Sequence, residues 1–251
     1  MIATPIKTEA VTPGGKSLLE LLDKYLDEMP ESSVLAITSK VVSICEGRTV
    51  PIDGLDEMDL IKQESQLFID PKDTSYGSRP TITRNTLASS AGIDKSNGSG
   101  HYILWPADPQ TTANGVRAYL KKRFGLKKVG VVITDSTSIP FRLGTTGIVL
   151  AFSGFSAINS YIGSPDIFGR PFEVSRANAA NGLAGIAVTV MGEGAEQTPL
   201  VLMQDLQFVS FMDRDPTQDE LNNLKLKIDS DLYSIFWKNA PWQKGDQFNS
   251  Y

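Results

Sequence analysis

The sequence predicts an α+β fold built from mixed sheets with packed helices. Short apolar runs with the length of buried strands occur at residues 33–38, 129–134 and 199–203. Helical patterns lie between these runs without a regular alternation of strand and helix, which favours α+β over a doubly wound parallel sheet. With 251 residues, the chain can bury a full core without disulfides or structural metal ions.

The helices are predicted from their end signals and from apolar residues that share one face. Ser17 and Glu20 form a capping box at the start of a helix over 17–29. Gly125 is the stop signal of a helix over 111–124. The remaining expected elements are a helix over 56–70, strands over 102–105, 148–152 and 172–174, a small-residue helix over 177–191 and one amphipathic helix over 219–237. The polar stretch over 70–100 is expected to be either disordered or functional.

Composition excludes several classes of protein. The chain has 24 Lys and Arg against 29 Asp and Glu, a net charge of −5 that argues against a general nucleic-acid binder. The single cysteine, Cys45, rules out an intrachain disulfide and a cysteine-based zinc site. The first residues lack the basic start and apolar core of a signal peptide, and no window approaches ~20 uninterrupted apolar residues. We therefore expect a cytoplasmic protein with neither nucleic acid nor membrane as a partner.

The familiar nucleotide and hydrolase motifs are missing. The sequence contains neither the phosphate loop of P-loop proteins nor the glycine fingerprint of dinucleotide-binding folds, and it has no Gly-x-Ser-x-Gly elbow. His101 is the only histidine, so multi-histidine metal sites are excluded. A metal site in this chain would be built from oxygen ligands, which suits Mg²⁺, Mn²⁺ or Ca²⁺.

Two aspartates are candidates for such a site. Asp135 closes the apolar run 129–134, so a buried strand would bring its carboxylate to a sheet edge beside the Ser136 hydroxyl. The alternative is that Asp135 starts a turn and caps local amides. Asp94 stands before Lys95-Ser96-Asn97-Gly98, where an Asx-turn explains an aspartate equally well.

Three other residues are open to a functional or a structural interpretation. Lys40 follows Thr38-Ser39 at a strand end and can bind phosphate as a point charge, or it is a solvated surface lysine. His101, between Gly100 and Tyr102, is expected to be a structural or surface residue. Cys45 is expected to be a small buried hydrophobic residue and not a nucleophile.

Five segments, taken in order, resemble one family. They are Ile-Thr-Ser-Lys-Val-Val-Ser-Ile-Cys-Glu-Gly-Arg at 37–48, Ser-Ala-Gly-Ile-Asp-Lys-Ser-Asn at 90–97, Gly-Val-Val-Ile-Thr-Asp-Ser at 130–136, Asp-Ile-Phe-Gly-Arg at 166–170 and Val-Met-Gly-Glu at 190–193. Together they resemble the γ-glutamyl ligases that extend the deazaflavin coenzyme F-420. The resemblance runs from about residue 33 to residue 203 and is fairly specific, because five segments keep their order.

The resemblance implies a concrete activity. Members of this family are homodimers with an unusual α+β fold, and they use GTP and a divalent metal ion, Mg²⁺ or Mn²⁺. They join L-glutamate to a carboxylate of the growing cofactor through an acyl phosphate. Residues 1–211 are accordingly expected to form the ligase-like domain, as one body or as two intertwined subdomains, and residues 212–251 a helical C-terminal extension.

The resemblance also assigns roles to individual residues. The implied metal ligands are Asp94, Asp135, Ser136, which stands where the family commonly has threonine, and Glu193, which stands where a glutamine is expected. The implied catalytic residues are Lys40 and Arg142. The implied nucleotide- and substrate-binding residues are Ser39, Lys40, Glu46, Arg48, Ser96, Asn97, Gly144 and Thr146.

The chain departs from the family pattern at five positions. Ile44 replaces a lysine, Thr145 and Gly147 replace a glutamine and an aspartate, and Asn181-Gly182 replaces an acidic pair. These changes keep two other interpretations open: a non-catalytic or divergent relative that binds nucleotide or metal, and a metal-dependent phosphohydrolase that uses both candidate aspartates. If the chain is a ligase, they predict an acceptor smaller or less anionic than the family's usual one.

Overall fold

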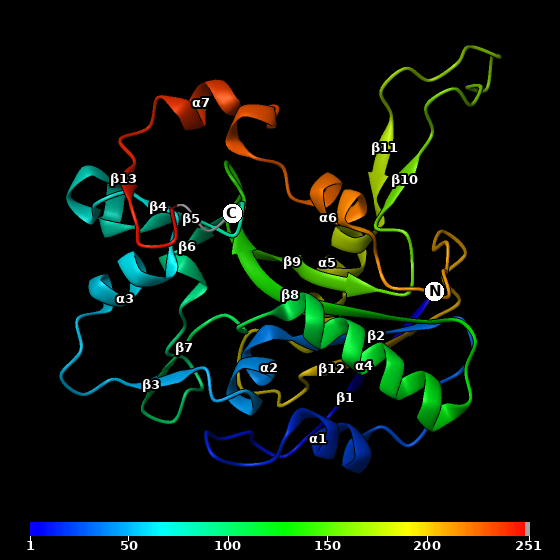
Figure 1. Cartoon of the computed structure of the whole chain (residues 1–251), viewed down its shortest axis with the longest axis horizontal. Coiled ribbons are helices and arrows are strands. Elements are labelled where there is room, and N and C mark those ends of the chain that lie inside the picture. Colours follow the sequence, from blue (N-terminus) through cyan, green and yellow to red (C-terminus); the bar gives the residue numbers. More distant parts are fainter. Residues whose placement is uncertain (249–251) are drawn as a thin grey trace.

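A computed structural model describes residues 1–248, and its centre is a mixed sheet of five strands (Figure 1). The strand order is β1-β12-β2-β8-β9, with β2 and β8 parallel and the other neighbours antiparallel. The strands are β1 (Ile2–Ile6), β2 (Ser33–Thr38), β8 (Val129–Ser138), β9 (Thr145–Ser153) and β12 (Leu200–Gln204). The mixture of helices and sheets confirms the predicted α+β class, and β2 has the bounds expected from its apolar run.

Helices cover both faces of this sheet (Figure 1). Leu35 and Ile37 of β2 face a core shared with α1 (Leu18–Tyr25) and α4 (Pro109–Phe124). The alternate residues of β2 face a second core, shared with α5 (Ala179–Met191). Both faces of the strand are therefore buried, which explains why the sequence of β2 is a continuous apolar run.

The predicted end signals act as expected. Ser17 accepts the backbone N–H of Glu20 while the Glu20 side chain accepts the N–H of Ser17, and α1 begins there. Asp108 caps α4, and Gly125 ends it in the left-handed conformation with φ of 67°. The α1 helix ends at Tyr25, four residues before the predicted end.

A smaller four-stranded sheet lies beside the main one. Its order is β13-β4-β5-β6, and the antiparallel pair β3-β7 and helix α3 lie next to it. The elements are β3 (Thr49–Pro51), α3 (Glu57–Glu64), β4 (Leu67–Phe68), β5 (Pro80–Thr83), β6 (Thr86–Ser89), β7 (His101–Ile103) and β13 (Gln243–Lys244). Their core is formed mainly by Leu60, Ile61, Phe68 and Leu104. The polar stretch over 70–100 therefore contributes β5 and β6 to this second sheet, with turns and loops around them.

Three local features differ from those predicted. The helix expected over 56–70 ends at Glu64, because residues 67–68 form β4. Residues after Thr38 form a short helix, α2 (Ser39–Cys45), which no sequence pattern predicts. Residues 172–174 do not form a strand, because Phe172 makes only an isolated bridge to Ile162. Instead β10 (Ile158–Ser160) and β11 (Arg176–Asn178) form the base of a projecting arm, whose tip extends from the molecule (Figure 1).

The expectation of one helix over 219–237 is wrong. The segment divides into α6 (Gln218–Leu224), a 3₁₀ turn and α7 (Ser234–Lys238). Leu221 and Leu224 pack against the core beside α5, whereas Leu232 and Ile235 are exposed, so a single apolar face is not buried along the whole segment. The chain then returns to the smaller sheet, where β13 pairs with β4. Within residues 1–248, every helix is too short or too polar to cross a membrane.

Candidate active site

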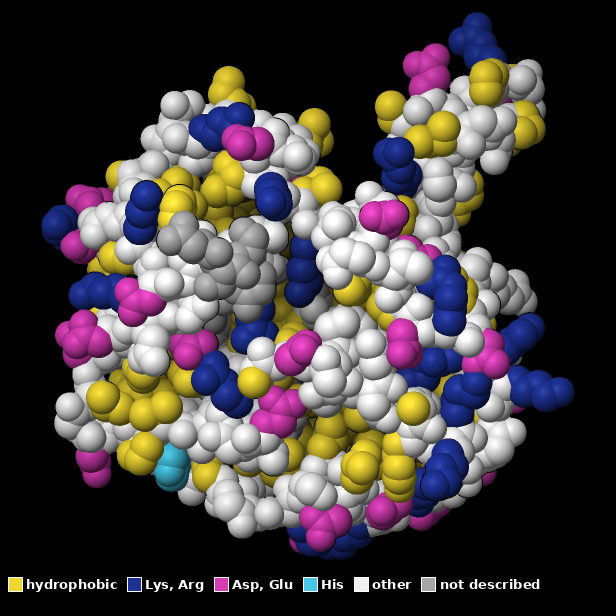
Figure 2. All heavy atoms as spheres, in the orientation of Figure 1, with side chains coloured by type: hydrophobic (Ala, Val, Ile, Leu, Met, Phe, Trp, Pro, Cys, Tyr) yellow, Lys and Arg dark blue, Asp and Glu magenta, His cyan; other side chains and the backbone are white. Residues whose placement is uncertain are grey.

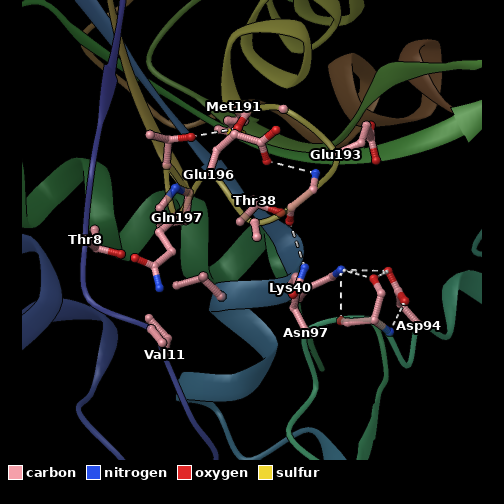
Figure 3. Close-up of a pocket in the computed structure, with 18 of the residues that line it drawn as sticks. Thr8, Val11, Thr38, Lys40, Asp94, Asn97, Met191, Glu193, Glu196 and Gln197 are labelled. Atoms are coloured by element: carbon pink, nitrogen blue, oxygen red, sulfur yellow. Dashed lines mark hydrogen bonds and ion pairs between the residues drawn. The ribbon is translucent and has the colours of Figure 1, made fainter.

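A cavity of about 290 Å³ opens where β2 ends beside β8 (Figure 3). The two strands are parallel, and Thr38, the last residue of β2, pairs with Thr134 of β8. Beyond this pair β8 continues to Ser138 against β9 alone, so Asp135 lies within a strand and not after its end. The cavity walls come from the start of α2, the end of β8, the 94–97 segment, the loop after α5 and the 8–11 segment. Of the predicted site residues, it is lined by Lys40, Asp94, Ser96, Asn97, Asp135, Ser136 and Glu193.

Lys40 and Asp94 both line the cavity and form an ion pair with each other (Figure 3). The Lys40 Nζ atom lies 2.7 Å from Oδ2 of Asp94 and also donates to the Ser96 hydroxyl at 3.0 Å. Oδ1 of Asp94 accepts the Ser96 backbone N–H at 2.6 Å, so Asp94 does form the Asx-turn that the sequence allowed. Desolvation acts to raise the pKa of Asp94, but the hydrogen bonds from Lys40 and Ser96 hold it below its usual value.

Asp135 has a different environment, which keeps its proton more tightly. Its Oδ1 accepts the Ser39 hydroxyl at 3.2 Å and its Oδ2 accepts the indole N–H of Trp105 at 2.6 Å. Burial, with a smaller contribution from the negative charge of Asp94, raises the pKa of Asp135 to about 6, although hydrogen bonds from Trp105, the Ser136 backbone and Ser39 act in the opposite direction. The two carboxylates therefore titrate separately.

Trp105 is a site residue that the sequence analysis missed. Its indole stacks against Gly92, where an added Cβ would lie 2.1 Å from Nε1, and Gly92 has a φ of 75°. Only glycine fits there without displacing the ring. A buried tryptophan needs a hydrogen-bond acceptor for its indole N–H. The presence of a tryptophan at the end of an apolar run is the one sequence signal that could point to Trp105.

The loop after α5 is the second part of the site that the sequence did not indicate. Oε2 of Glu196 accepts the N–H of Gly194 at 2.8 Å, and a Cβ on Gly192 would lie 2.5 Å from the Glu196 carboxyl carbon. The backbone N–H of Thr8 donates to the Gln197 carbonyl at 2.8 Å, which joins the N-terminal segment to this loop. Gln197, with φ of 59°, lines the cavity beside Thr8 and Val11 (Figure 3).

The chemistry of the cavity suits a hard divalent cation, with fewer carboxylates than the sequence predicted. Asp94 and Asp135 supply two acidic oxygens and Ser136 a hydroxyl, and desolvation of the second aspartate is a cost that a bound cation would relieve. Glu193 lines the same cavity, but its Oε1 accepts the Thr145 hydroxyl at 3.1 Å. Among residues 1–248 there is no cluster of three or more acidic, histidine or cysteine side chains placed to hold a metal ion.

Glu46 and Arg48 do not line the cavity. The Arg48 guanidinium donates to Glu64 at 2.6 Å and to the Trp105 carbonyl at 3.1 Å. It therefore joins the end of α3 to the segment that follows β7. Glu46 accepts the Thr112 hydroxyl at 2.6 Å and the Ala107 N–H at 3.1 Å. In the single chain, the side chains of Glu46 and Arg48 therefore hold neighbouring segments of the fold together.

Arg142, Gly144 and Thr146 also lie away from the cavity. Arg142 and Gly144 are in the exposed turn between β8 and β9, and among residues 1–248 the Arg142 guanidinium donates only to the neighbouring Phe141 carbonyl, at 2.9 Å. Thr146 lies on β9 near Gly185 of α5. The chain alone does not bring these three residues together with Lys40.

Of the five departures from the family pattern, only Ile44 lines the cavity. A Cβ on Gly147 would lie 2.1 Å from the Ala184 carbonyl oxygen, so glycine permits β9 to approach α5. The register of β8 and β9 shifts between Ile133 and Thr134, and the Val149 N–H on β9 is accepted by Asn181 at 2.9 Å. Gly147 and Asn181 thus have packing and hydrogen-bonding roles in this chain.

The two residues expected to be structural lie outside the cavity. The His101 ring interacts through Nδ1 with the Ser99 carbonyl at 3.0 Å. Burial raises the pKa of the Cys45 thiol to about 11, so it is unreactive near neutral pH.

Comparison with known proteins agrees with the five-segment resemblance. Residues 5–205 match the sequence profile described as F420-0:Gamma-glutamyl ligase. A protein of Methanopyrus kandleri named Coenzyme F420:L-glutamate ligase is 30% identical over 219 residues, covering 81% of this chain and 86% of that protein. Proteins of the same name from Archaeoglobus fulgidus and Methanocaldococcus jannaschii are 28% and 29% identical, covering 80% and 75% of this chain and 86% and 80% of their own lengths. The chain belongs to the F420-0:Gamma-glutamyl ligase family.

Proposed function

We propose that this protein joins L-glutamate to a carboxylate of a deazaflavin acceptor of the coenzyme F-420 type and uses GTP to activate that carboxylate. The observation that carries the proposal is the meeting of Lys40, Asp94 and Asp135 in one cavity, where the parallel pairing of β2 with β8 ends. A fixed cation next to two carboxylates of different pKa is suited to phosphoryl transfer, which depends on positioning and charge compensation.

Asp94, Asp135 and Ser136 are the residues that would hold Mg²⁺ or Mn²⁺. Two carboxylates and a hydroxyl leave room for phosphate oxygens and water, the arrangement in which proteins commonly hold these ions. When bound, the ion would offset negative charge on the nucleotide phosphates. The lowered pKa of Asp94 keeps its carboxylate ionised in weak acid, whereas Asp135, with a pKa of about 6, is mostly ionised at pH 7 and loses its ability to act as a ligand as the pH falls below 6.

The side chains around the cavity would bind and orient the substrates during two chemical steps. An oxygen of the acceptor carboxylate attacks the γ-phosphorus of GTP and GDP leaves, which gives an acyl phosphate. The amine of glutamate then attacks the acyl carbon, and phosphate leaves as the amide forms. Lys40 would orient the phosphates through its ammonium group, and Asn97 and Gln197 offer amides to the polar parts of the substrates.

Ile44 supports a narrower proposal about the acceptor. It gives the cavity an apolar wall at a position where the family pattern has a cation. A site with one cation fewer discriminates less strongly in favour of a polyanionic acceptor, so we expect a smaller or less anionic acceptor to be preferred. Competition between the deazaflavin and simpler carboxylates, at saturating GTP and Mn²⁺, tests this preference.

We also propose that the protein acts as a homodimer. Phe141 and Leu143 in the β8–β9 turn and Ile167 and Phe168 at the tip of the arm are 85% or more exposed, and Figure 2 shows hydrophobic side chains gathered on the arm. Large apolar side chains at this exposure are typical of an interface. Arg142 lies in the same turn, so a second copy could bring it to substrate. A monomeric mass in solution, measured by light scattering, would contradict this proposal.

The experiment that tests the function is an assay of phosphate release. The protein is incubated with GTP and Mn²⁺, alone and with L-glutamate, the deazaflavin acceptor or both. Release that requires both supports a ligase. Release without them indicates a phosphohydrolase, and nucleotide binding without release indicates a non-catalytic relative; either result would overturn the proposal.

A further inference from the structure

A second cavity, of about 410 Å³, lies apart from the first and shares none of its lining residues. It is enclosed by α6 of the C-terminal tail (residues from 212 onward), by the turn between β5 and β6 and by the start of α4. Leu150 of the edge strand β9 forms part of its apolar wall. Figure 2 shows a hollow between the tail and the body of the molecule, with Lys and Arg side chains beside it.

Two cations line this cavity, and one of them has no counterion. No carboxylate pairs with the Lys225 ammonium in the part of the chain that the structure describes. Burial, with a smaller contribution from the positive charge of Arg84, lowers the pKa of Lys225 to about 8, although the negative charge of Asp108 acts in the opposite direction. Lys225 is thus a half-buried lysine that shares the cavity with a second positive charge, an arrangement that a bound anion would stabilise.

Arg84 is held in position but keeps donors free. One guanidinium nitrogen donates to the Pro106 carbonyl at 2.7 Å, which uses only part of its five-donor fork. Arg84 and Asn85 form the β5–β6 turn with positive φ values of 50° and 55°. The Asn85 backbone N–H donates to Gln66 at 2.8 Å, which fixes this turn to the smaller sheet.

The one acidic side chain in the lining is already engaged. Asp108 accepts the N–H groups of Gln110 and Thr111 through Oδ1 and the Thr111 hydroxyl through Oδ2 at 2.6 Å. These hydrogen bonds hold the carboxylate at the first turn of α4, and its negative charge acts on Arg84 and Lys225 without forming an ion pair with either. The titratable groups of the cavity are Arg84, Lys225 and Asp108, so their net charge is positive, and Asn222 adds a neutral amide.

We propose that this second cavity binds the phosphate group of a small molecule. A dianionic phosphate matches two converging cations, one a compact ammonium and the other a fork of N–H donors. The site joins the tail to the body of the molecule, so occupancy would also hold α6 in place. Free phosphate and a phosphomonoester share this chemistry, and the experiment separates them.

The test measures binding of inorganic phosphate and of glycerol 3-phosphate to the full chain, by calorimetry and by thermal denaturation, against KCl at equal ionic strength. Both probes are expected to raise the melting temperature, because they bind the folded state selectively. If only glycerol 3-phosphate binds, the ester is the ligand. If neither probe binds, the proposal is wrong.

Variants locate the binding. Lys225→Gln should weaken phosphate binding by about tenfold or more, the loss expected when one charge-assisted hydrogen bond is removed. Lys227→Gln, an exposed lysine on the same tail, is the matched control and should have no effect. Asn222→Asp keeps the oxygen that accepts the Gln218 amide but adds a negative charge, and it should also weaken binding. Phosphate binding that is lost in Lys40→Met and retained in Lys225→Gln would assign the phosphate to the first cavity and overturn the proposal.

Discussion

The indole N–H of Trp105 donates a 2.6 Å hydrogen bond to Oδ2 of Asp135, across a sequence separation of 30 residues. This contact fixes one oxygen of the carboxylate and lowers its pKa against the effect of burial. The glycine at position 92 leaves the space that the indole ring occupies. The position and protonation of Asp135 therefore depend on a residue that does not line the cavity.

Trp105→Phe should lower both the stability of the protein and its Mn²⁺ affinity without unfolding it. Phenylalanine keeps most of the buried ring but removes the donor, so we expect a loss of about 1–3 kcal/mol in unfolding free energy, the range for a hydrogen bond to a charged group. The pKa of Asp135 should rise, because a hydrogen bond that lowers it is lost. Trp237→Phe, which removes an indole donor to Asp231 in the tail, is the control. Unchanged Mn²⁺ affinity and an unchanged pKa would show that Trp105 does not act through Asp135.

Metal affinity should fall as the solution becomes acidic. The Asp135 pKa of about 6 means that the carboxylate is mostly ionised at pH 7 and mostly protonated at pH 5. A proton competes with the cation for the same oxygens, so Mn²⁺ binding should weaken by about tenfold from pH 7 to pH 5. Mn²⁺ titration followed by electron paramagnetic resonance measures this, and Asp135→Asn should abolish the dependence. Affinity that is constant over this range would exclude Asp135 as a ligand.

The raised pKa of Asp135 also means that the ionised carboxylate lowers the stability of the metal-free protein. The folded-state pKa lies above the ordinary 3.8, so the folded state binds more protons than the unfolded chain between about pH 4 and pH 6. Stability should therefore decrease as the pH rises through this window. In EDTA, Asp135→Asn should be at least as stable as the wild type at pH 7, and this advantage should disappear at pH 4. A large loss of stability at pH 7 would favour a capping role for Asp135.

Lys40→Met should reduce nucleotide affinity. The ammonium group is the one cation that lines the cavity among the described residues, and its loss should cost about 1–3 kcal/mol, as for a charge-assisted hydrogen bond. Lys95→Met removes a nearby lysine that pairs with Glu57, outside the cavity, and serves as the control. Fluorescence titration with a labelled GTP analogue measures both. Wild-type affinity in Lys40→Met would remove this lysine from the nucleotide site.

Substitution by alanine should change the stability of the fold in opposite directions at Gly147 and Gly182. Gly147→Ala places a Cβ 2.1 Å from the Ala184 carbonyl oxygen and should destabilise the fold by about 1–3 kcal/mol through overpacking. Gly182→Ala, within α5 and with open space around its Cα, should stabilise it by about 0.5–1 kcal/mol. Urea denaturation gives both values. Equal effects would mean that the departure at Gly147 does not reflect the packing of β9 on α5.

The parts of the fold and site that the sequence predicted are those fixed by local patterns. The apolar run of β2 predicts the bounds of that strand, and the apolar run 129–134 predicts the buried part of β8. The strand continues past this run to Ser138, so Asp135 lies within β8 and not at the sheet edge where the sequence predicted it. A phosphate-binding role for Lys40 stays a prediction. The structure places Lys40 and Asp135 around one cavity because β2 and β8 are parallel neighbours.

The remaining features depend on contacts between distant residues. Asn97 donates to the Gly194 carbonyl at 3.0 Å over a separation of 97 residues, and nothing in either segment alone indicates the contact. Arg48 looked like a phosphate ligand in sequence because a cation at a turn has no local partner, but Glu64 on α3 pairs with it. The tail was expected to be one helix because periodicity cannot reveal that its second half remains exposed at Leu232.

The most direct test of the central claim is mass spectrometry of the acceptor after incubation with the full-length protein, L-glutamate, GTP and Mn²⁺. The account predicts an acceptor that gains a glutamyl residue in wild type and in the Lys95→Met control, and no product with Asp135→Asn or Lys40→Met, although both variants remain folded. An acceptor that stays unmodified with the folded wild-type protein, or product formed equally well by the Asp135→Asn and Lys40→Met variants, would contradict it.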